Sequence, residues 1–272
     1  MSKVWTWIDG LSSPYAYKSG LRIFTALVYL WFVISAFLVW DIRELIWGPQ
    51  SVLLRFGMQS ELSVTYAYSL MFSPELFPYI FYPHVISAVL SIFEFRWVFI
   101  PRIITWITGI LLVFAGFNAF NAGFMFMLLL AFYCIPINTS RNTPVQNTIN
   151  HLGAYAAMIQ IALGYGFSAL YKLSGEMWPS GEAVYYALEL RRFSTDWVTH
   201  LGITKQYWLM HLFTWIALGY QMLFPIAVWF NKSRKILIWI GVAMHVTIAV
   251  VMHLWDFSLA MLFGYAVFLK KK

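Results

Sequence analysis

Residues 21–40 read LRIFTALVYLWFVISAFLVW, a run that contains a single charged residue, Arg22. A helix of this length and apolarity crosses roughly 30 Å of bilayer hydrocarbon. Seven further apolar runs follow, which predicts an all-α integral membrane protein, a polytopic bundle of about eight transmembrane helices. The last two runs share a turn near 253–256, so they could form two helices or one broken helix. The predicted spans are Leu21–Trp40, Phe77–Phe93, Phe99–Phe117, Phe120–Ile137, Thr148–Lys172, Tyr207–Phe230, Lys235–Met252 and Leu254–Leu269.

The composition excludes several classes of protein. Of the 272 residues, 61% are hydrophobic and 11% are charged, whereas soluble domains carry about 25% charged residues. The single cysteine, Cys134, excludes an internal disulfide framework. No two histidines have metal-ligand spacing on one helix, so we expect no bound metal. The net charge of +7 is better explained by cytoplasmic Lys and Arg than by a nucleic-acid partner.

The distribution of charge predicts the orientation of the chain. With eight spans, both termini and the turns near 96–102, 141 and 232–235 share one side, which holds twelve of the 18 Lys and Arg residues. Cytoplasmic loops of membrane proteins are enriched in these residues. We therefore expect a multi-pass protein of the cell membrane, in contact with membrane lipid, with both termini in the cytoplasm.

Two connections are longer than a helical bundle needs. Residues 41–76 and 174–206 contain glycine and proline turn signals, and long loops are disproportionately functional. We expect an extracytoplasmic loop subdomain here, within a single transmembrane domain over residues 1–272. Residues 1–20 are expected to lie on the membrane surface. A short helix is predicted over Glu182–Arg192, with an apolar face formed by Ala183, Tyr186, Ala187 and Leu190.

The fifth span carries a polar stripe, in which Gln160, Gly164, Ser168 and Lys172 follow one another at intervals of four residues. Such a stripe either packs against a neighbouring helix or lines a polar cavity with Lys172 at its mouth. Lys172 itself either snorkels to the interface or serves as a general base in its neutral form. The following loop residue Trp178, with Tyr185 or Tyr186, is expected to fold back and close the cavity.

Two histidines are further candidates. His245 lies about 15 Å into the seventh span, near the bilayer centre, where an ionisable residue is a functional hypothesis by default. The alternative is a neutral histidine hydrogen-bonded between helices. His253 and Asp256 could pair at the mouth of the site or cap a turn.

The stretch QIALGYGFSALYKLSGEMWPSGEAVYYAL, residues 160–188, resembles the signature of the HTTM superfamily, which includes the membrane part of vitamin K-dependent gamma-carboxylases. The resemblance rests on the Lys-Leu pair at 172–173, followed by Trp-x-x-Gly-x-Ala and tyrosines. Weaker marks are Arg22, the Asn-Ala-Gly triplet at 121–123, and His245 before the Phe-Ser pair at 257–258. The resemblance to the superfamily covers roughly residues 14–269.

The resemblance implies that Lys172 is the base that deprotonates a quinol such as vitamin K hydroquinone. His245 is a second candidate catalytic residue because of its predicted depth in the membrane. The carboxylases have an Asn-His pair where this chain has Asn121 and Ala122, so one histidine of their chemistry is missing. The candidate substrate-binding residues are Asn121, Gln160, Ser168, Trp178, Tyr185, Tyr186 and His253.

Three functions stay open at the level of sequence. The first is a gamma-carboxylase-like enzyme, a quinol-dependent lyase or oxidoreductase, acting on a lipid-soluble substrate at the outer membrane face. The second is a maturation factor for a small secreted antimicrobial peptide, which would work with a soluble partner protein, since the superfamily includes sporulation-delaying killing-factor proteins. The third is a non-catalytic lipid or peptide binder.

Overall fold

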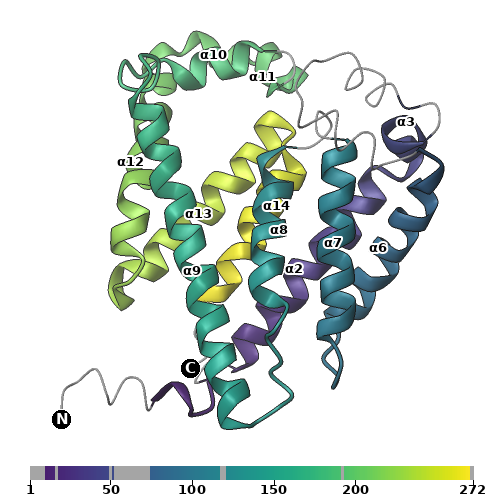
Figure 1. Cartoon of the computed structure of the whole chain (residues 1–272). Coiled ribbons are helices and arrows are strands. Elements are labelled where there is room, and N and C mark those ends of the chain that lie inside the picture. Colours follow the sequence, from purple (N-terminus) through teal and green to yellow (C-terminus); the bar gives the residue numbers. More distant parts are fainter. Residues whose placement is uncertain are drawn as a thin grey trace. The chain divides into compact units, whose positions relative to one another are not determined.

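The computed structural model describes residues 10–15, 18–48, 51, 74–116, 121–190 and 193–269, and in these ranges every regular element is a helix (Figure 1). The predicted all-α class is confirmed there. Parts of the expected surface segment 1–20 and of the loop 41–76 lie outside the described residues. The apolar helices are α2 (Lys18–Leu38), α6 (Phe77–Ile92), α7 (Phe99–Ala115), α8 (Ala122–Cys134), α9 (Pro144–Leu173), α12 (Tyr207–Ala227), α13 (Asn231–Met252) and α14 (Trp255–Gly264).

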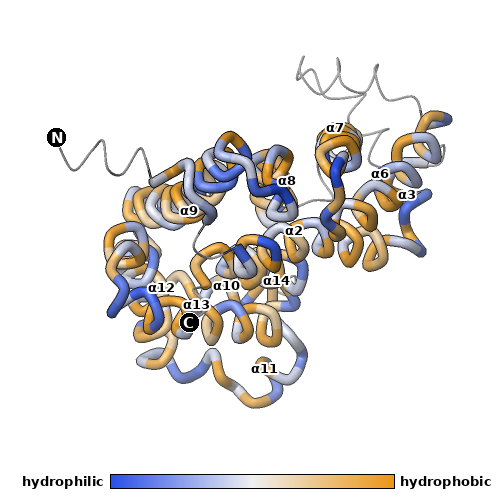
Figure 2. Tube along the Cα trace, turned by 90° about the horizontal axis from the view of Figure 1, so that it is seen from below, coloured by the Kyte–Doolittle hydropathy of each residue, from blue (hydrophilic) through white to orange (hydrophobic). Residues whose placement is uncertain are grey.

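Four of these helices, α2, α9, α12 and α13, are long and apolar enough to cross a membrane, and the other four are shorter. Large apolar side chains cover their outer surfaces, and Figure 2 shows apolar residues along the length of the helices. Tyr171 is 83% exposed, Trp239 72% and Phe167 66%. Large apolar side chains exposed to this extent on helices that are apolar enough to cross a membrane are consistent with a membrane protein.

The chain divides into two compact units, of which unit 1 comprises residues 1–157 and 269–272. In unit 1, α2 packs against α6 and α8, and α7 packs against both α6 and α8. Aromatic side chains fill the contacts: the ring of Phe124 lies 5.2 Å from Trp31 and 5.7 Å from Phe32, edge to face. The Trp47 indole donates to the Leu112 carbonyl at 2.9 Å and so ties the 40–48 segment to α7.

Arg102 is buried, although a charged residue near a predicted turn is expected at the surface. The sequence puts it in a cytoplasmic turn, but the side chain is fully buried in unit 1. Its guanidinium donates to the carbonyl of Cys134, the last residue of α8, and to that of Ile137, and it lies over the Tyr29 ring. A cation at a helix C-terminus satisfies carbonyls that have no partner within the helix. Arg102 therefore caps the C-terminal end of α8 inside the fold, and its charge does not lie on the surface.

Unit 2 comprises residues 158–268 and holds the second half of α9 together with α12, α13 and α14. α12 packs against α13, and α13 against α14. α13 ends at His253, whose φ of 54° is left-handed, and α14 begins two residues later. The last two apolar runs are therefore two helices that fold against each other, with a tight turn between them, and not one broken helix.

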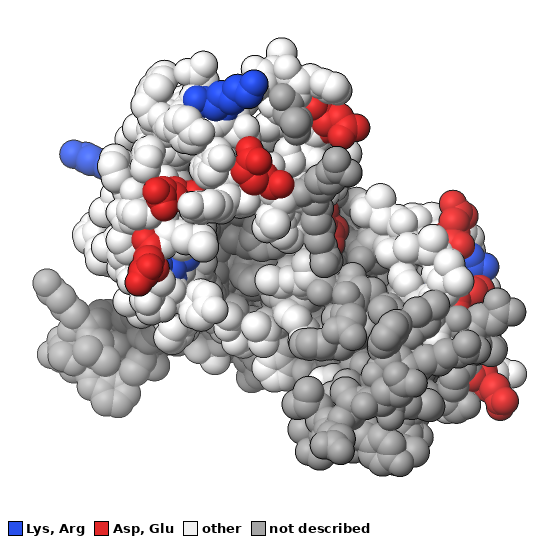
Figure 3. All heavy atoms as spheres, turned by 90° about the horizontal axis from the view of Figure 1, so that it is seen from above, with Lys and Arg blue, Asp and Glu red and all other residues white. Residues whose placement is uncertain are grey.

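The 174–206 segment covers one end of unit 2 as a small helical subdomain. It contains α10 (Ala183–Glu189), α11 (Asp196–His200) and a 3-10 turn, η5 (Ile203–Lys205). Leu188 and Val198 form a buried cluster with Met210 of α12, and Thr195 donates to the Val251 carbonyl near the end of α13. Figure 3 shows acidic side chains on the outer face of this segment; its exposed acidic residues are Glu176, Glu182, Glu189 and Asp196.

The predicted helix over residues 182–192 is confirmed over Ala183–Glu189, but its predicted apolar face is wrong in part. Ala183 is buried, whereas Tyr186 is 45% and Leu190 55% exposed. Leu188 is buried instead, because α10 packs against α12 through that side. A helix this short has too few apolar positions for periodicity to fix which face is buried.

Candidate functional site

Lys172 lies in the last turn of α9, and its side chain turns toward α12 within unit 2. The Lys172 ammonium donates to the side-chain carbonyl Oε1 of Gln221 at 2.8 Å. Ser168, one turn earlier on α9, donates its hydroxyl to the same oxygen at 3.1 Å. The Gln221 amide oxygen thus accepts two hydrogen bonds from one face of α9 and holds the lysine side chain in a fixed direction.

The loop after α9 covers the Lys172 amine from the other side. Trp178 places its ring 4.3 Å from Nζ, the geometry of a cation–π contact. Among the described residues, no carboxylate accepts a hydrogen bond from Lys172, which is half-buried. In the part of the chain that the structure describes, the partners of this amine are therefore a neutral amide and an indole.

The position of Gln221 shows which part of α12 the amine contacts. Gln221 is the fifteenth residue of α12, about 21 Å along the helix axis from Tyr207, where α12 begins. The loop contacts α12 nearer that beginning, where Trp215 donates to the Pro179 carbonyl and His211 to the Ser180 carbonyl. A lysine that snorkels extends its amine toward water. Lys172 instead holds its amine against Gln221 of α12 and the Trp178 ring.

A second polar group, the tyrosine cluster, consists of Tyr165 on α9, Tyr220 on α12, His245 on α13 and Tyr265 just after α14. The Tyr165 hydroxyl is 2.8 Å from His245 Nε2 and also hydrogen-bonds the Tyr265 hydroxyl. Tyr220, which precedes Gln221 on α12, lies 2.9 Å from Tyr265, oxygen to oxygen, and donates to the Leu237 carbonyl. All four rings are buried, and the three hydroxyl groups and His245 Nε2 pair with one another in place of water, whereas His245 Nδ1 has no hydrogen-bond partner among the described residues.

Gly241 explains how α13 comes close enough to join the tyrosine cluster. A Cβ at this position would collide with the hydroxyl groups of Tyr220 and Tyr265. The glycine is therefore required by a close approach of the helix backbone to two phenols.

The structure brings together four of the predicted site residues. Lys172, Ser168 and Trp178 share one group of contacts, and His245 is linked to the same face of α9 through Tyr165. His245 is buried and hydrogen-bonded to Tyr165 on another helix, which fits the second interpretation that the sequence offered.

The predicted four-residue stripe is only partly the polar face of α9. Gly164 is exposed, and Gln160 lies three turns before Lys172. The residues that face α12 and α13 are Tyr165, Ser168 and Lys172, at intervals of three and four. A strict interval of four drifts by about 40° per step on a helix of 3.6 residues per turn, so it leaves the buried face after a few turns.

The remaining predicted site residues lie elsewhere. Tyr185 and Tyr186 line a pocket with Tyr207 and His211, and Lys172 is not among its lining residues, so the tyrosines do not close over the amine. Asn121 lies in unit 1, where its side chain accepts from the Gly123 amide at 2.8 Å as the N-cap of α8. His253 is exposed at the C-cap of α13, as the turn interpretation predicted.

Sequence reasoning missed Gln221, Tyr165, Tyr220 and Tyr265. One signal was present: Gln221 is an amide within an otherwise apolar span, and such residues usually face the interior of the bundle. The tyrosines gave no signal of their own, since tyrosine is common throughout this chain and its hydroxyl can also point to the interface.

Comparisons of the chain with protein-family models, with curated proteins and with solved structures give no match.

Proposed function

We propose that all eight apolar helices cross the membrane, with both termini in the cytoplasm and the 174–206 subdomain outside. The positions of the eight helices and the bias of Lys and Arg toward one side support this topology. The four shorter helices would cross where the bilayer is locally thin or where their flanking residues reach the interface.

We further propose that the chain is a gamma-carboxylase-like membrane enzyme in which Lys172 is the base for a quinol or another lipid-soluble O–H acid. The observation that carries this proposal is the set of partners of Lys172, a neutral amide and an indole with no carboxylate among the described residues. A quinol, when bound, supplies an acidic hydroxyl. Transfer of its proton to neutral Nζ gives an ammonium ion and a quinolate without any further reactant.

The other residues of the site would position the amine and the substrate. Gln221 keeps Nζ in place through the hydrogen bond to Oε1, and would stabilise the ammonium after proton transfer. Trp178 offers a flat apolar ring beside the amine, which suits a flat aromatic substrate. Exposed apolar side chains on α9, among them Phe167 and Leu170, give such a substrate a path from the lipid. The chemistry of these residues therefore fits a quinol.

The experiment is consumption of a reduced naphthoquinol by the purified chain in maltoside detergent under air, measured by chromatography against a protein-free blank. We expect wild type to consume quinol, and the control Lys205→Met, which removes an exposed lysine, to consume it at the same rate. Lys172→Met and Lys172→Arg should be slower by about 10²-fold or more, because a positioned base raises the reaction rate by about 10²–10⁴-fold. Arginine keeps the charge but stays protonated. A folded Lys172→Arg variant at the full rate, or a wild type at the blank rate, would exclude this function.

A further inference from the structure

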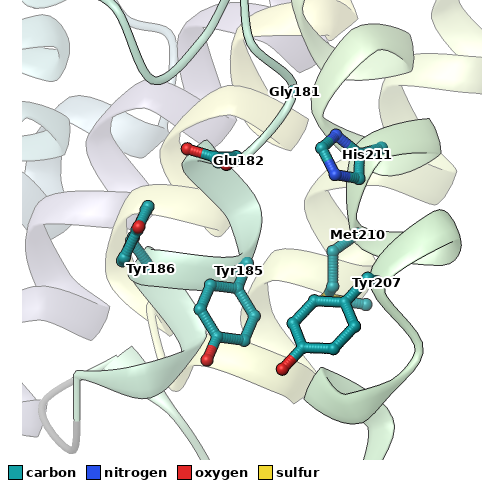
Figure 4. A pocket seen from close by; sticks show the side chains of 7 residues that line it. All are labelled: Gly181, Glu182, Tyr185, Tyr186, Tyr207, Met210 and His211. Atoms are coloured by element: carbon teal, nitrogen blue, oxygen red, sulfur yellow. The ribbon is translucent and has the colours of Figure 1, made fainter.

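Side chains of the 174–206 subdomain and of the first turns of α12 form a pocket, apart from Lys172 and from the tyrosine cluster (Figure 4). Its volume is about 140 Å³, the scale of a small headgroup. The turn at Gly181 closes one side with φ of 87°, and a Cβ there would collide with the His211 ring. Only glycine allows the turn to approach α12 so closely. The side chains that line the pocket are Glu182, Tyr185, Tyr186, Tyr207, Met210 and His211.

Aromatic rings make up much of the pocket wall. The Tyr185 ring lies 5.4 Å from Tyr207 and 5.3 Å from Tyr186, with the ring planes inclined by 47° and 71°. Tyr207 is 60% exposed, so a ligand can reach the wall from outside. Aromatic rings grouped at different inclinations are how proteins hold alkylammonium ions, because each ring face attracts positive charge.

The polar groups of the pocket favour a cation as well. Glu182 places a carboxylate at its edge, and no Lys or Arg is among the lining residues. Outside the set of lining residues, the negative charge of Glu189 raises the pKa of the Tyr185 phenol. His211 donates from Nδ1 to the Ser180 carbonyl at 3.1 Å, so its other nitrogen is an acceptor in the neutral ring, and Figure 4 shows that nitrogen directed into the pocket.

We propose that this pocket binds an organic cation of the alkylammonium class, either as a free small molecule or as the headgroup of a lipid. An anion would meet the Glu182 carboxylate without a compensating positive side chain. A metal ion would lack ligands, because no group of three His, Cys, Asp or Glu in the described part of the chain is placed to hold one. The pocket is separate from Lys172, so this proposal does not depend on the proposed base.

Choline and its uncharged isostere 3,3-dimethylbutan-1-ol separate recognition of a cation from simple hydrophobic binding. Calorimetric titration of the full chain in maltoside detergent should show choline binding at least about tenfold more tightly than the isostere. The exposed positions allow substitution without loss of the fold: Tyr207→Leu and Glu182→Gln should each weaken choline binding by about three- to tenfold. The matched controls Tyr171→Leu and Glu176→Gln should leave it unchanged. Equal binding of the isostere, absence of choline binding, or unchanged affinity in both pocket variants would overturn the proposal.

Nanodiscs distinguish the two sources of the cation. If lipid headgroups occupy the pocket, choline should bind more weakly in phosphatidylcholine nanodiscs than in phosphatidylglycerol nanodiscs, and Tyr207→Leu should remove that difference. Equal affinity in the two lipids, together with the variant effects above, assigns the pocket to a free organic cation.

Discussion

Replacement of Gly241 by alanine tests the buried tyrosine cluster with a single methyl group. The added Cβ would collide with the hydroxyl groups of Tyr220 and Tyr265. These rings are only 5% and 2% exposed, so neither can move aside without breaking the hydrogen bond between them. Overpacking a core costs about 1–3 kcal/mol, and the better helix propensity of alanine returns about 0.5–1 kcal/mol. We expect Gly241→Ala to lower the free energy of unfolding by about 0–2.5 kcal/mol, with a central value of about 1 kcal/mol.

The assay is reversible unfolding in mixed micelles of maltoside and dodecyl sulfate, followed by circular dichroism. Gly219→Ala in α12 is the matched control, because a Cβ there meets nothing within 4 Å. That variant should be unchanged or more stable by up to about 1 kcal/mol. If Gly241→Ala proves as stable as Gly219→Ala, then α13 does not approach the tyrosines as closely as the fold requires.

Three further outcomes are expected. Tyr165→Phe leaves the buried His245 Nε2 without its hydrogen-bond partner and should lower the free energy of unfolding by about 1–3 kcal/mol. The control Tyr171→Phe should leave the free energy of unfolding unchanged. Asn121→Ala should lower the free energy of unfolding by about 1 kcal/mol because the α8 N-cap is lost, and Asn121→Ser should keep the wild-type stability. Neither variant should change the rate of quinol consumption. A changed rate would indicate that Asn121 binds substrate. Because Cys134 is buried, a thiol reagent should label only cysteines introduced at Ser180 and Ser233. Ser180→Cys should react with reagent added outside the cell, and Ser233→Cys should react only after the membrane is permeabilised. The opposite result would mean that the topology is inverted.

Most of the helical architecture could be predicted because it depends on local signals. Apolar runs bounded by charges and glycine or proline located the eight apolar helices within a few residues, and the Lys-Leu pair at 172–173 led to the amine. The division into two units and the helix α11 had no comparable signal. Both result from which faces pack together, and that depends on the whole fold.

The partners of the candidate base could not be predicted for the same reason. Lys172 and Gln221 are separated by 49 residues, and their hydrogen bond depends on how α9 and α12 align. Periodicity on α9 alone could indicate a polar face but not its exact positions, which is why Gly164 was included and Tyr165 was missed. Tyr185 and Tyr186 were assigned to the lysine because they follow it closely in sequence. The turn at Gly181 instead carries them to the first turns of α12.

The most direct measurement of Lys172 as a base is the anaerobic absorption difference spectrum of a reduced naphthoquinol bound to the purified chain. Without oxygen no turnover can follow, so the spectrum reports only whether the bound quinol has lost its proton. Wild type and Lys205→Met should produce a stoichiometric amount of quinolate, and Lys172→Met and Lys172→Arg should produce none. Quinolate formed equally by Lys172→Met, or a wild type that binds only the neutral quinol, would contradict the assignment of Lys172 as the base.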